Sequence, residues 1–220
     1  DVGSRSGALK SAASAPSAYP RQDACASQRD VRDWKGDEQM DHGLEIATLG
    51  GGCFWCLEAV FQELAAVRSV TSGYCGGNVA APSYEAVCGG GTGHAEVVKI
   101  AFDPAALPFA TLLDVFFAIH DPTTPNRQGN DVGTQYRSAI FCQSEAQRDA
   151  ALAAAARAEA HWGRPVVTEI VGPVPAHPFW PAEDYHRDYF RLHGHQPYCA
   201  FVVAPKVVKA RQAFAHLLAR

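Results

Sequence analysis

Hydrophobic and polar residues alternate in five stretches of the chain, the pattern of a strand that turns one face toward a core. The alternation begins in "LEIATLG" and is enriched in β-branched residues further along, as in "HAEVVKIAFD". Glycine and proline interrupt the pattern between these stretches, as expected for turns. The predicted strands cover residues 44–50, 67–74, 94–103, 136–142 and 165–171.

Other stretches repeat apolar residues every three to four positions, which predicts helices with one buried side. Pro108 stands near the start of one of them, and Ser144 with Gln147 forms a capping box before an alanine-rich run. The predicted helices cover residues 53–64, 108–121, 144–161, 181–193 and 205–219.

The order of the first six elements is β-α-β-β-α-β, followed by α-β-α-α. This order predicts an α+β fold with a ferredoxin-like split βαβ core and a mostly antiparallel sheet with helices packed on it. Residues 44–220 are expected to form one folded domain. Residues 1–43 contain few large apolar residues and no clear periodicity, so we expect an N-terminal tail that is partly disordered.

The composition argues against some classes of partner but does not indicate a specific function. The chain has 220 residues, 47% hydrophobic and 19% charged, with a net charge of −4, which does not favour a nucleic-acid partner. No apolar run approaches the roughly 18 residues of a membrane span, so we expect no membrane association. We expect a cytoplasmic monomer. A leader that had already been removed would leave no trace in a chain that begins at Asp1.

The seven cysteines are too sparse for a disulfide scaffold, and their odd number leaves at least one without a partner in the chain. Most of them fit the interpretation of buried core thiols. Cys53 and Cys56, in "LGGGCFWCLEAVF", do not. Three glycines allow a tight turn into the helix, whose N-terminus favours negative charge. We therefore predict a lowered pKa for Cys53 and a role as a nucleophile.

Cys56 lies one helical turn after Cys53, on the same face, so a reversible disulfide between them is plausible. A zinc half-site would need a second ligand pair at similar spacing, which the sequence lacks. Two inert buried thiols are the other alternative. The large aromatic residues Phe54 and Trp55 argue against a general thioredoxin-like exchange motif, because they suit an apolar wall for a small group such as a methyl.

Two further stretches contain candidate site residues. "SYEAVCGGGTGHAEVV" can bring Tyr84 and Glu96 together through its glycine-rich turn. An acid in a cleft among apolar residues has a raised pKa, so Glu96 is a candidate proton donor. "GNDVGTQYRSAIF" contains Asp131 and Tyr136, and the tyrosine hydroxyl could donate a hydrogen bond to an oxygen in a pocket.

These motifs together resemble the A-type peptide methionine sulfoxide reductases over about residues 44–220. The similarity rests on a series of segments in the family's order: "GGCFWC", "SGYCGG", "TGHAEVVKIAFDP", "DVGTQYRSAIF", "AEDYHRDYF" and "QPYCAFVVAPKV". The resemblance implies a thiol enzyme that reduces the S epimer of methionine sulfoxide, free or in proteins. It also implies a sulfenic acid intermediate, then a disulfide that thioredoxin or a similar dithiol reduces, with no metal, flavin or nucleotide cofactor.

The resemblance also assigns residues. Cys53 corresponds to the nucleophile, and Phe54 and Trp55 to the pocket for the substrate's methyl group. Glu96 corresponds to the acid that protonates the sulfoxide oxygen. The remaining correspondences are hydroxyl groups that bind that oxygen and a carboxylate that organises the site: Tyr84, Tyr136 and Asp131.

The resolving thiol is the weakest correspondence. Many family members have glycine in place of Cys56 and resolving cysteines near a glycine-rich C-terminus, whereas this chain has no cysteine after Cys199. Cys75 also stands where a small residue is more usual. We predict that Cys56 resolves the sulfenic acid, with Cys199 as the alternative. A general thiol–disulfide oxidoreductase using Cys53 and Cys56 is the alternative function.

Overall fold

The structure is a computed structural model that describes residues 43–173 and 177–219. The predicted tail, residues 1–43, lies almost wholly outside this range and stays a prediction. The strands are β1 (Glu45–Gly51), β2 (Val67–Cys75), β3 (Ala95–Phe102), β4 (Arg127–Gln128), β5 (Asp131–Val132), β6 (Ser138–Phe141), β7 (Glu169–Val171) and β8 (Trp180–Pro181).

Six strands form one sheet in the order β7-β6-β1-β3-β2-β8. Neighbouring strands are antiparallel except β6 and β7, which run parallel. β1 and β3 lie at the centre, where Ala47 opposes Ile100 and Leu49 opposes Val98, all four fully buried. The sheet is therefore mixed, with helices packed on it, and the predicted α+β class is confirmed.

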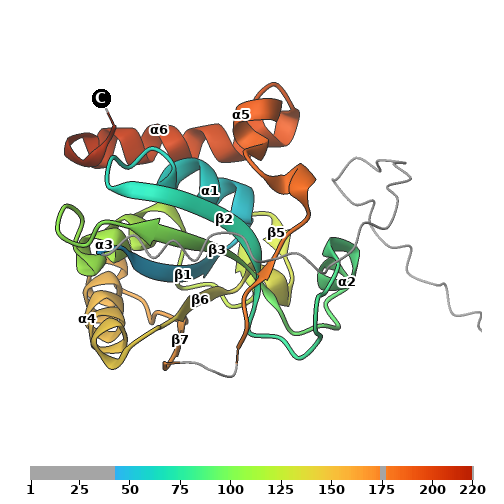
Figure 1. The fold of residues 1–220 in the computed structure, drawn as a ribbon, viewed down its shortest axis with the longest axis horizontal. Coiled ribbons are helices and arrows are strands. Elements are labelled where there is room, and N and C mark those ends of the chain that lie inside the picture. The colour runs from blue at the N-terminus through green and yellow to red at the C-terminus, as the bar shows by residue number, and fades with distance from the viewer. Residues whose placement is uncertain (1–42, 174–176, 220) are drawn as a thin grey trace, which may run out of the picture. The chain divides into compact units, whose positions relative to one another are not determined.

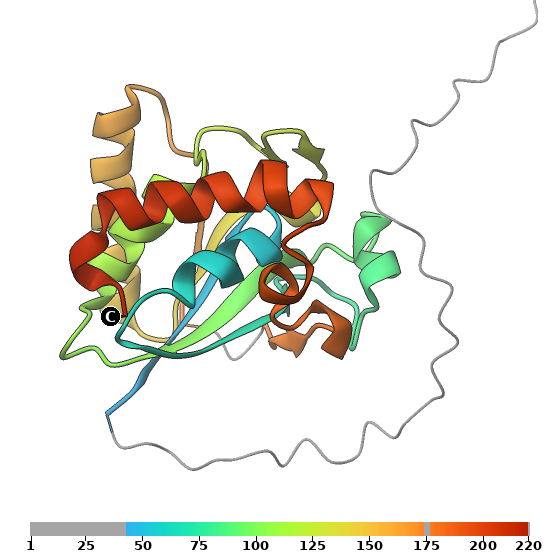
Figure 2. The same ribbon diagram turned by 90° about the horizontal axis from the view of Figure 1, so that it is seen from above.

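The α-helices are α1 (Phe54–Phe61), α2 (Tyr84–Cys88), α3 (Phe109–Ile119), α4 (Glu145–Trp162), α5 (Tyr189–His193) and α6 (Ala204–Ala213). Short 3₁₀ or π turns complete the helical set: η1 (Thr134–Tyr136), η2 (Asp184–His186), η3 (Cys199–Val203) and η4 (Ala215–Leu217). Helix α1 packs on β2 and β3, and α6 packs on α1 on the side away from the sheet (Figures 1 and 2). None of the helices in the described residues has both the length and the apolar character needed to cross a membrane.

The predicted serine cap of α4 is confirmed, but the reciprocal bond of a capping box is not, because Oε1 of Gln147 accepts the N–H of Gln143 at 3.0 Å. The Ser144 hydroxyl accepts a hydrogen bond from the Gln147 backbone N–H at 3.2 Å. The helix ends at Gly163, whose φ of 62° is the left-handed conformation common after a helix. The predicted helix over 144–161 thus agrees with the structure to within a residue or two.

The C-terminal third of the chain departs most from the predictions. The helix expected over 181–193 is instead strand β8, turn η2 and helix α5, because Asp188 adopts a positive φ of 53° that no α-helix continues through. The helix expected over 205–219 ends at Ala213 and begins earlier, in the π turn η3. The strand expected over 165–171 pairs only over β7. Helix α2 was not predicted, because its five residues are too few to show a helical period.

Candidate active site

The three glycines connect β1 directly to α1. Gly52 has a φ of 94°, and a Cβ there would lie 2.6 Å from the Gln128 side chain, so the turn requires glycine. Cys53 is the N-cap of α1, as predicted, with an extended backbone and 2% of its surface exposed. The Cys56 N–H donates to the Cys53 carbonyl at 3.0 Å. The sequence thus places both thiols at the buried start of α1.

The predicted lowering of the Cys53 pKa is wrong. Burial raises the pKa of the Cys53 thiol well above its ordinary value, and the neighbouring Cys56 raises it further. The side-chain hydrogen bond from Cys53 lowers the pKa of Cys56 to about 7, and the positive charge of Lys206 also lowers it. The two sulfurs thus share one negative charge near neutral pH.

Glu96 lies on the central strand β3 and is 1% exposed. Its Oε2 accepts the backbone N–H of Phe54 at 3.0 Å, so the carboxyl group occupies the N-terminus of α1 beside the thiols. Burial raises the pKa of Glu96 to about 8, although the Phe54 hydrogen bond lowers it. The predicted raised pKa is therefore confirmed, and the carboxyl group is largely protonated at neutral pH.

Phe54 and Trp55 form a buried aromatic surface next to the thiols. The Trp55 ring stacks on Tyr189 of α5, with ring centroids 3.7 Å apart and planes 5° from parallel. The Trp55 indole N–H donates to Nδ1 of His186 at 3.1 Å. Burial lowers the pKa of His186 to about 4, so this ring is neutral and accepts the bond. The predicted apolar wall is thus backed by residues from the far end of the chain.

Tyr84 and Tyr136 approach Glu96 from two separate elements. Tyr84 begins α2, and its ring stacks on Phe54 with centroids 6.4 Å apart. Tyr136 ends η1 and is 4% exposed. Burial and the charge of Glu96 raise the pKa of Tyr84 far above its ordinary value, so its hydroxyl remains a hydrogen-bond donor. Glu96 and Tyr136 both lie close enough to Tyr84 to raise its pKa, so the structure brings these three predicted residues together.

Comparisons with known proteins agree on the family of the chain that contains this site. The model of the family "Peptide methionine sulfoxide reductase" matches residues 45–218. The chain belongs to this family. A curated relative from Ralstonia nicotianae, "Peptide methionine sulfoxide reductase MsrA", is 57% identical over 182 residues, covering 80% of this chain and 93% of that protein. A relative of the same name from Thermus thermophilus is 53% identical and covers 79% of this chain and 97% of its own length.

Solved structures give the same result. Reduced Mxr1 from Saccharomyces cerevisiae has a TM-score of 0.66 and 33% identity, covering 71% of this chain and 90% of that one. Methionine sulfoxide reductase A of Corynebacterium diphtheriae has a TM-score of 0.64 and 34% identity. The match covers 71% of this chain and 79% of that one. As a member of the family, the chain is a peptide-methionine (S)-S-oxide reductase, an oxidoreductase that reduces methionine sulfoxide with a thiol.

In this reductase Asp131 does not contact Glu96 directly. The hydroxyl of Tyr198 donates to Oδ2 of Asp131 at 2.7 Å and also forms a side-chain hydrogen bond with Cys53. Burial raises the pKa of Asp131, while Tyr198 and Lys206 lower it. Tyr198 therefore links the predicted carboxylate to the predicted nucleophile.

Four residues of the reductase site were not predicted: His186, Tyr189, Tyr198 and Lys206. They lie within or just after "AEDYHRDYF" and "QPYC", segments that the family resemblance included without giving them roles. Buried aromatic residues in an irregular segment were the only signal available. That signal does not tell which helix the rings will contact.

The other cysteines differ in their surroundings. Cys199 on η3 is fully buried, and Cys56 is close enough to contribute to the rise in its pKa. Cys88 is exposed, and the buried Cys75 thiol donates to the carbonyl of His177 at 3.4 Å. All six cysteines in the described residues, Cys142 included, are reduced. Among the cysteines of the described residues, Cys56 therefore lies beside Cys53, and Cys199 lies near Cys56.

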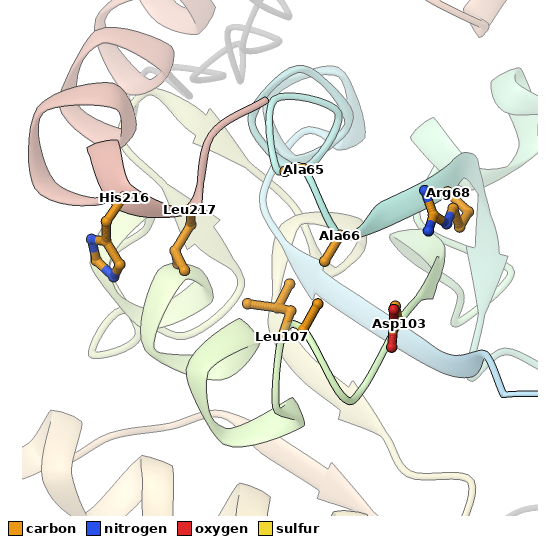
Figure 3. A pocket seen from close by; sticks show the side chains of 8 residues that line it. Ala65, Ala66, Arg68, Asp103, Leu107, His216 and Leu217 are labelled. Atoms are coloured by element: carbon orange, nitrogen blue, oxygen red, sulfur yellow. The ribbon is translucent and has the colours of Figure 1, made fainter. Parts of the chain in front are cut away.

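A separate pocket of about 200 Å³ opens at the other end of α1 (Figure 3). It is lined by Ala65, Ala66, Arg68, Asp103, Ala106, Leu107, His216 and Leu217. This lining contains no thiol, so the pocket is not the reductase site. In the part of the chain that the structure describes, no three His, Cys, Asp or Glu side chains are grouped as a metal site would require.

Proposed function

We propose that the reductase acts through Cys53 as nucleophile and Glu96 as acid, with Phe54 and Trp55 around the substrate's methyl group and Tyr84 and Tyr136 binding its oxygen. One observation carries this proposal. A buried carboxyl group with a pKa of about 8 lies at the same helix N-terminus as the buried thiol pair. An acid that keeps its proton at neutral pH can protonate a departing oxygen while a sulfur attacks.

The first step begins with a proton transfer along the hydrogen bond from Cys53 to the Cys56 thiolate. The Cys53 thiolate then attacks the sulfoxide sulfur, and Glu96 gives its proton to the oxygen. The hydroxyl group then passes from the substrate sulfur to the Cys53 sulfur as the S–S and S–O bonds at the substrate sulfur break. One electron pair of these bonds forms the S–O bond of the Cys53 sulfenic acid, and the other stays on methionine, which leaves as the thioether. Glu96 is left as a carboxylate beside Asp131 and regains its proton from solvent.

In the second step, the Cys56 thiol condenses with the sulfenic acid, forming a disulfide and releasing water. The side-chain hydrogen bond between the two sulfurs supports Cys56 as the resolving residue. Disulfide geometry requires the first turn of α1 to loosen. Cys199 is the alternative, because it is buried near Cys56.

Mass spectrometry after one turnover without reductant tests this pairing. We expect a Cys53–Cys56 disulfide. Cys56→Ser should still release one methionine per enzyme, more slowly because the proton acceptor is lost, and then stall as the sulfenic acid. Cys199→Ser should cycle normally, as should Cys142→Ser, the control for loss of a remote buried thiol. If Cys56→Ser cycles with thioredoxin while Cys199→Ser stalls, the pairing is wrong.

Stereochemistry separates this function from general thiol–disulfide exchange. A methyl wall, oxygen-binding hydroxyls and one direction of attack fix three directions around the chiral sulfur. The S epimer should react and the R epimer should be recovered unchanged. Glu96→Gln should lose sulfoxide reduction but keep the capacity to form the Cys53–Cys56 disulfide with an added oxidant. Equal loss of both reactions would favour the general oxidoreductase.

We infer that thioredoxin or a similar dithiol reduces the resulting disulfide, since one turnover leaves the enzyme oxidised. We also infer a ferredoxin-like split βαβ core, which the inner strand order β6-β1-β3-β2 with antiparallel neighbours supports. A monomeric state and a cytoplasmic location stay predictions from the sequence, to be tested by light scattering and by cell fractionation.

A further inference from the structure

Glu183 connects two distant parts of the chain behind the substrate pocket. Its Oε1 accepts the backbone N–H of Tyr84 at 2.8 Å, and its Oε2 accepts the hydroxyl of Tyr74 at 2.9 Å. Oε2 also lies 3.7 Å from Nε2 of His186. One carboxylate therefore contacts three residues whose rings surround Phe54, at centroid distances of 4.9 to 6.4 Å.

The position of Glu183 is itself well fixed. It follows the edge strand β8, which pairs with β2 through Trp180 and Tyr74. The N–H of Ala182 donates to the Ser72 carbonyl at 2.9 Å and extends this attachment by one residue. The Glu183 carboxylate thus projects from a segment hydrogen-bonded to the main sheet.

Apart from the contacts of the Tyr84 ring with Phe54 and His186, helix α2 has far less support. Helix α2 has five residues, of which only Val87 is buried. The loops on both sides contain positive φ angles, at Ala81 before the helix and at Gly90 and Gly93 after it. A short helix between such loops has little packing to hold it in place. The bond from Glu183 to its first residue is a charged hydrogen bond, of the stronger class.

We propose that Glu183 is a positioning residue for Tyr84, holding α2 against the pocket so that the tyrosine hydroxyl meets the sulfoxide oxygen. Glu183 contacts the backbone of Tyr84 and not its hydroxyl, so it acts through placement and touches no reacting atom. The expected effect of Glu183 on the reaction rate rests on the proposed oxygen-binding role of Tyr84. The anchoring of α2 by Glu183 does not depend on that role.

Hydrogen exchange tests the anchoring directly. In Glu183→Ala the Tyr84 amide should exchange at least about tenfold faster, with the rest of α2 following, while amides of β3 stay unchanged. Glu183→Gln should exchange at a rate near wild type, because its amide oxygen can still accept the Tyr84 N–H. Unchanged exchange at Tyr84 in Glu183→Ala would overturn the proposal.

A double-mutant cycle tests the consequence for catalysis. Methionine release in a single turnover should slow between about ten- and a hundredfold in Glu183→Ala, and Glu183→Gln should largely rescue it. In a Tyr84→Phe background the effect of Glu183→Ala should disappear, because the hydroxyl that it positions is gone. Equal effects in both backgrounds would mean that Glu183 acts elsewhere, and would overturn the proposal.

Glu159→Ala is the matched control. Glu159 also accepts a backbone N–H through its carboxylate, from Val166 at 3.1 Å, but it lies on α4 and contacts no pocket residue. It should leave the turnover rate and the Tyr84 exchange unchanged. If Tyr84→Phe alone reacts at the wild-type rate, the proposed oxygen-binding role of Tyr84 fails, and the exchange experiment still decides whether Glu183 anchors α2.

Discussion

Two regions build the reductase site, and they differ in how regular they are. The segment from Leu49 to Phe61 is a strand, a glycine turn and a helix, and it contributes the thiols and the aromatic wall of Phe54 and Trp55. The segment from Trp180 to Val203 is a chain of short pieces, β8, η2, α5 and η3, and it contributes the residues behind that wall.

The first region supplies the reacting groups, and the second region supports their positions. In the first region local geometry alone brings Cys53 and Cys56 together, because they are one helical turn apart. In the second region the residues reach the site through contacts with elements that are distant in sequence. Glu58 illustrates the contact with the first region: it is 2% exposed on α1, and the backbone of Asp188 and Tyr189 at the start of α5 lies close enough to lower the pKa of its carboxyl group, although burial raises this pKa more. Changes in the first region should therefore abolish the reaction, and changes in the second should weaken or shift it.

The largest effect is expected at the nucleophile. Cys53→Ser should lower the single-turnover rate at least about a thousandfold, because a hydroxyl does not ionise near neutral pH. Methionine release measured without reductant checks this, with Cys142→Ser as the control for loss of a buried thiol. A folded Cys53→Ser that keeps more than a few per cent of the rate would remove Cys53 from the mechanism.

The next effect is expected at the acid. Glu96→Gln should lower the rate about a hundredfold. In the wild type, the rate should rise through about pH 7 as the thiol pair ionises and fall above about pH 8 as Glu96 loses its proton. A pH–rate profile of Glu96→Gln should lack the fall at alkaline pH. Glu145→Gln, at an exposed carboxylate on α4, should keep both limbs. If the rate of Glu96→Gln still falls at alkaline pH, the ionisation of another group causes that fall.

A smaller effect is expected in the irregular region. Tyr198→Phe removes the hydroxyl that bonds Asp131 and Cys53, and this hydroxyl lowers the pKa of Cys53. The rate should fall about tenfold, and the acidic limb of the pH–rate profile should move to higher pH. Tyr185→Phe, which removes a hydroxyl from a half-exposed ring of the same segment, should change neither. A thousandfold loss in Tyr198→Phe would contradict the division between the two regions.

The smallest effect on the reaction is expected where the two regions meet. Burial raises the pKa of Glu58 from 4.5 to about 7, so the folded state binds its proton more tightly than the unfolded state does. The stability of the wild type should therefore fall as the pH rises through this interval. Relative to Glu58→Gln, the unfolding free energy of the wild type should fall by on the order of 2 kcal/mol between pH 5 and 8.

Urea unfolding under reducing conditions measures the unfolding free energies of the wild type and of Glu58→Gln at each pH. The contributions of the other titrating groups cancel in the difference between the two. A constant difference across the range would mean that Glu58 keeps its ordinary pKa. The single-turnover rate of Glu58→Gln should stay within a few-fold of wild type, because glutamine has nearly the same shape and Glu58 has no role in the proposed reaction.

The sequence by itself determined the local features. Alternation placed Glu96 on a strand, the glycines and apolar spacing placed Cys53 at a helix start, and the serine and glutamine of the capping box placed the start of α4. These predictions succeeded because each depends on residues a few positions apart, where backbone geometry fixes the neighbours.

Only the tertiary structure decided the direction of the shift in the Cys53 pKa and which residues pack behind the aromatic wall. Burial raises this pKa, and α1 is covered by α5, η3 and α6, which are distant from it in sequence. The break at Asp188 directs Tyr189 onto Trp55 across 134 positions of sequence, and a left-handed aspartate gives no periodic signal. Desolvation and ring stacking act between residues distant in sequence, so they are set by the packed fold.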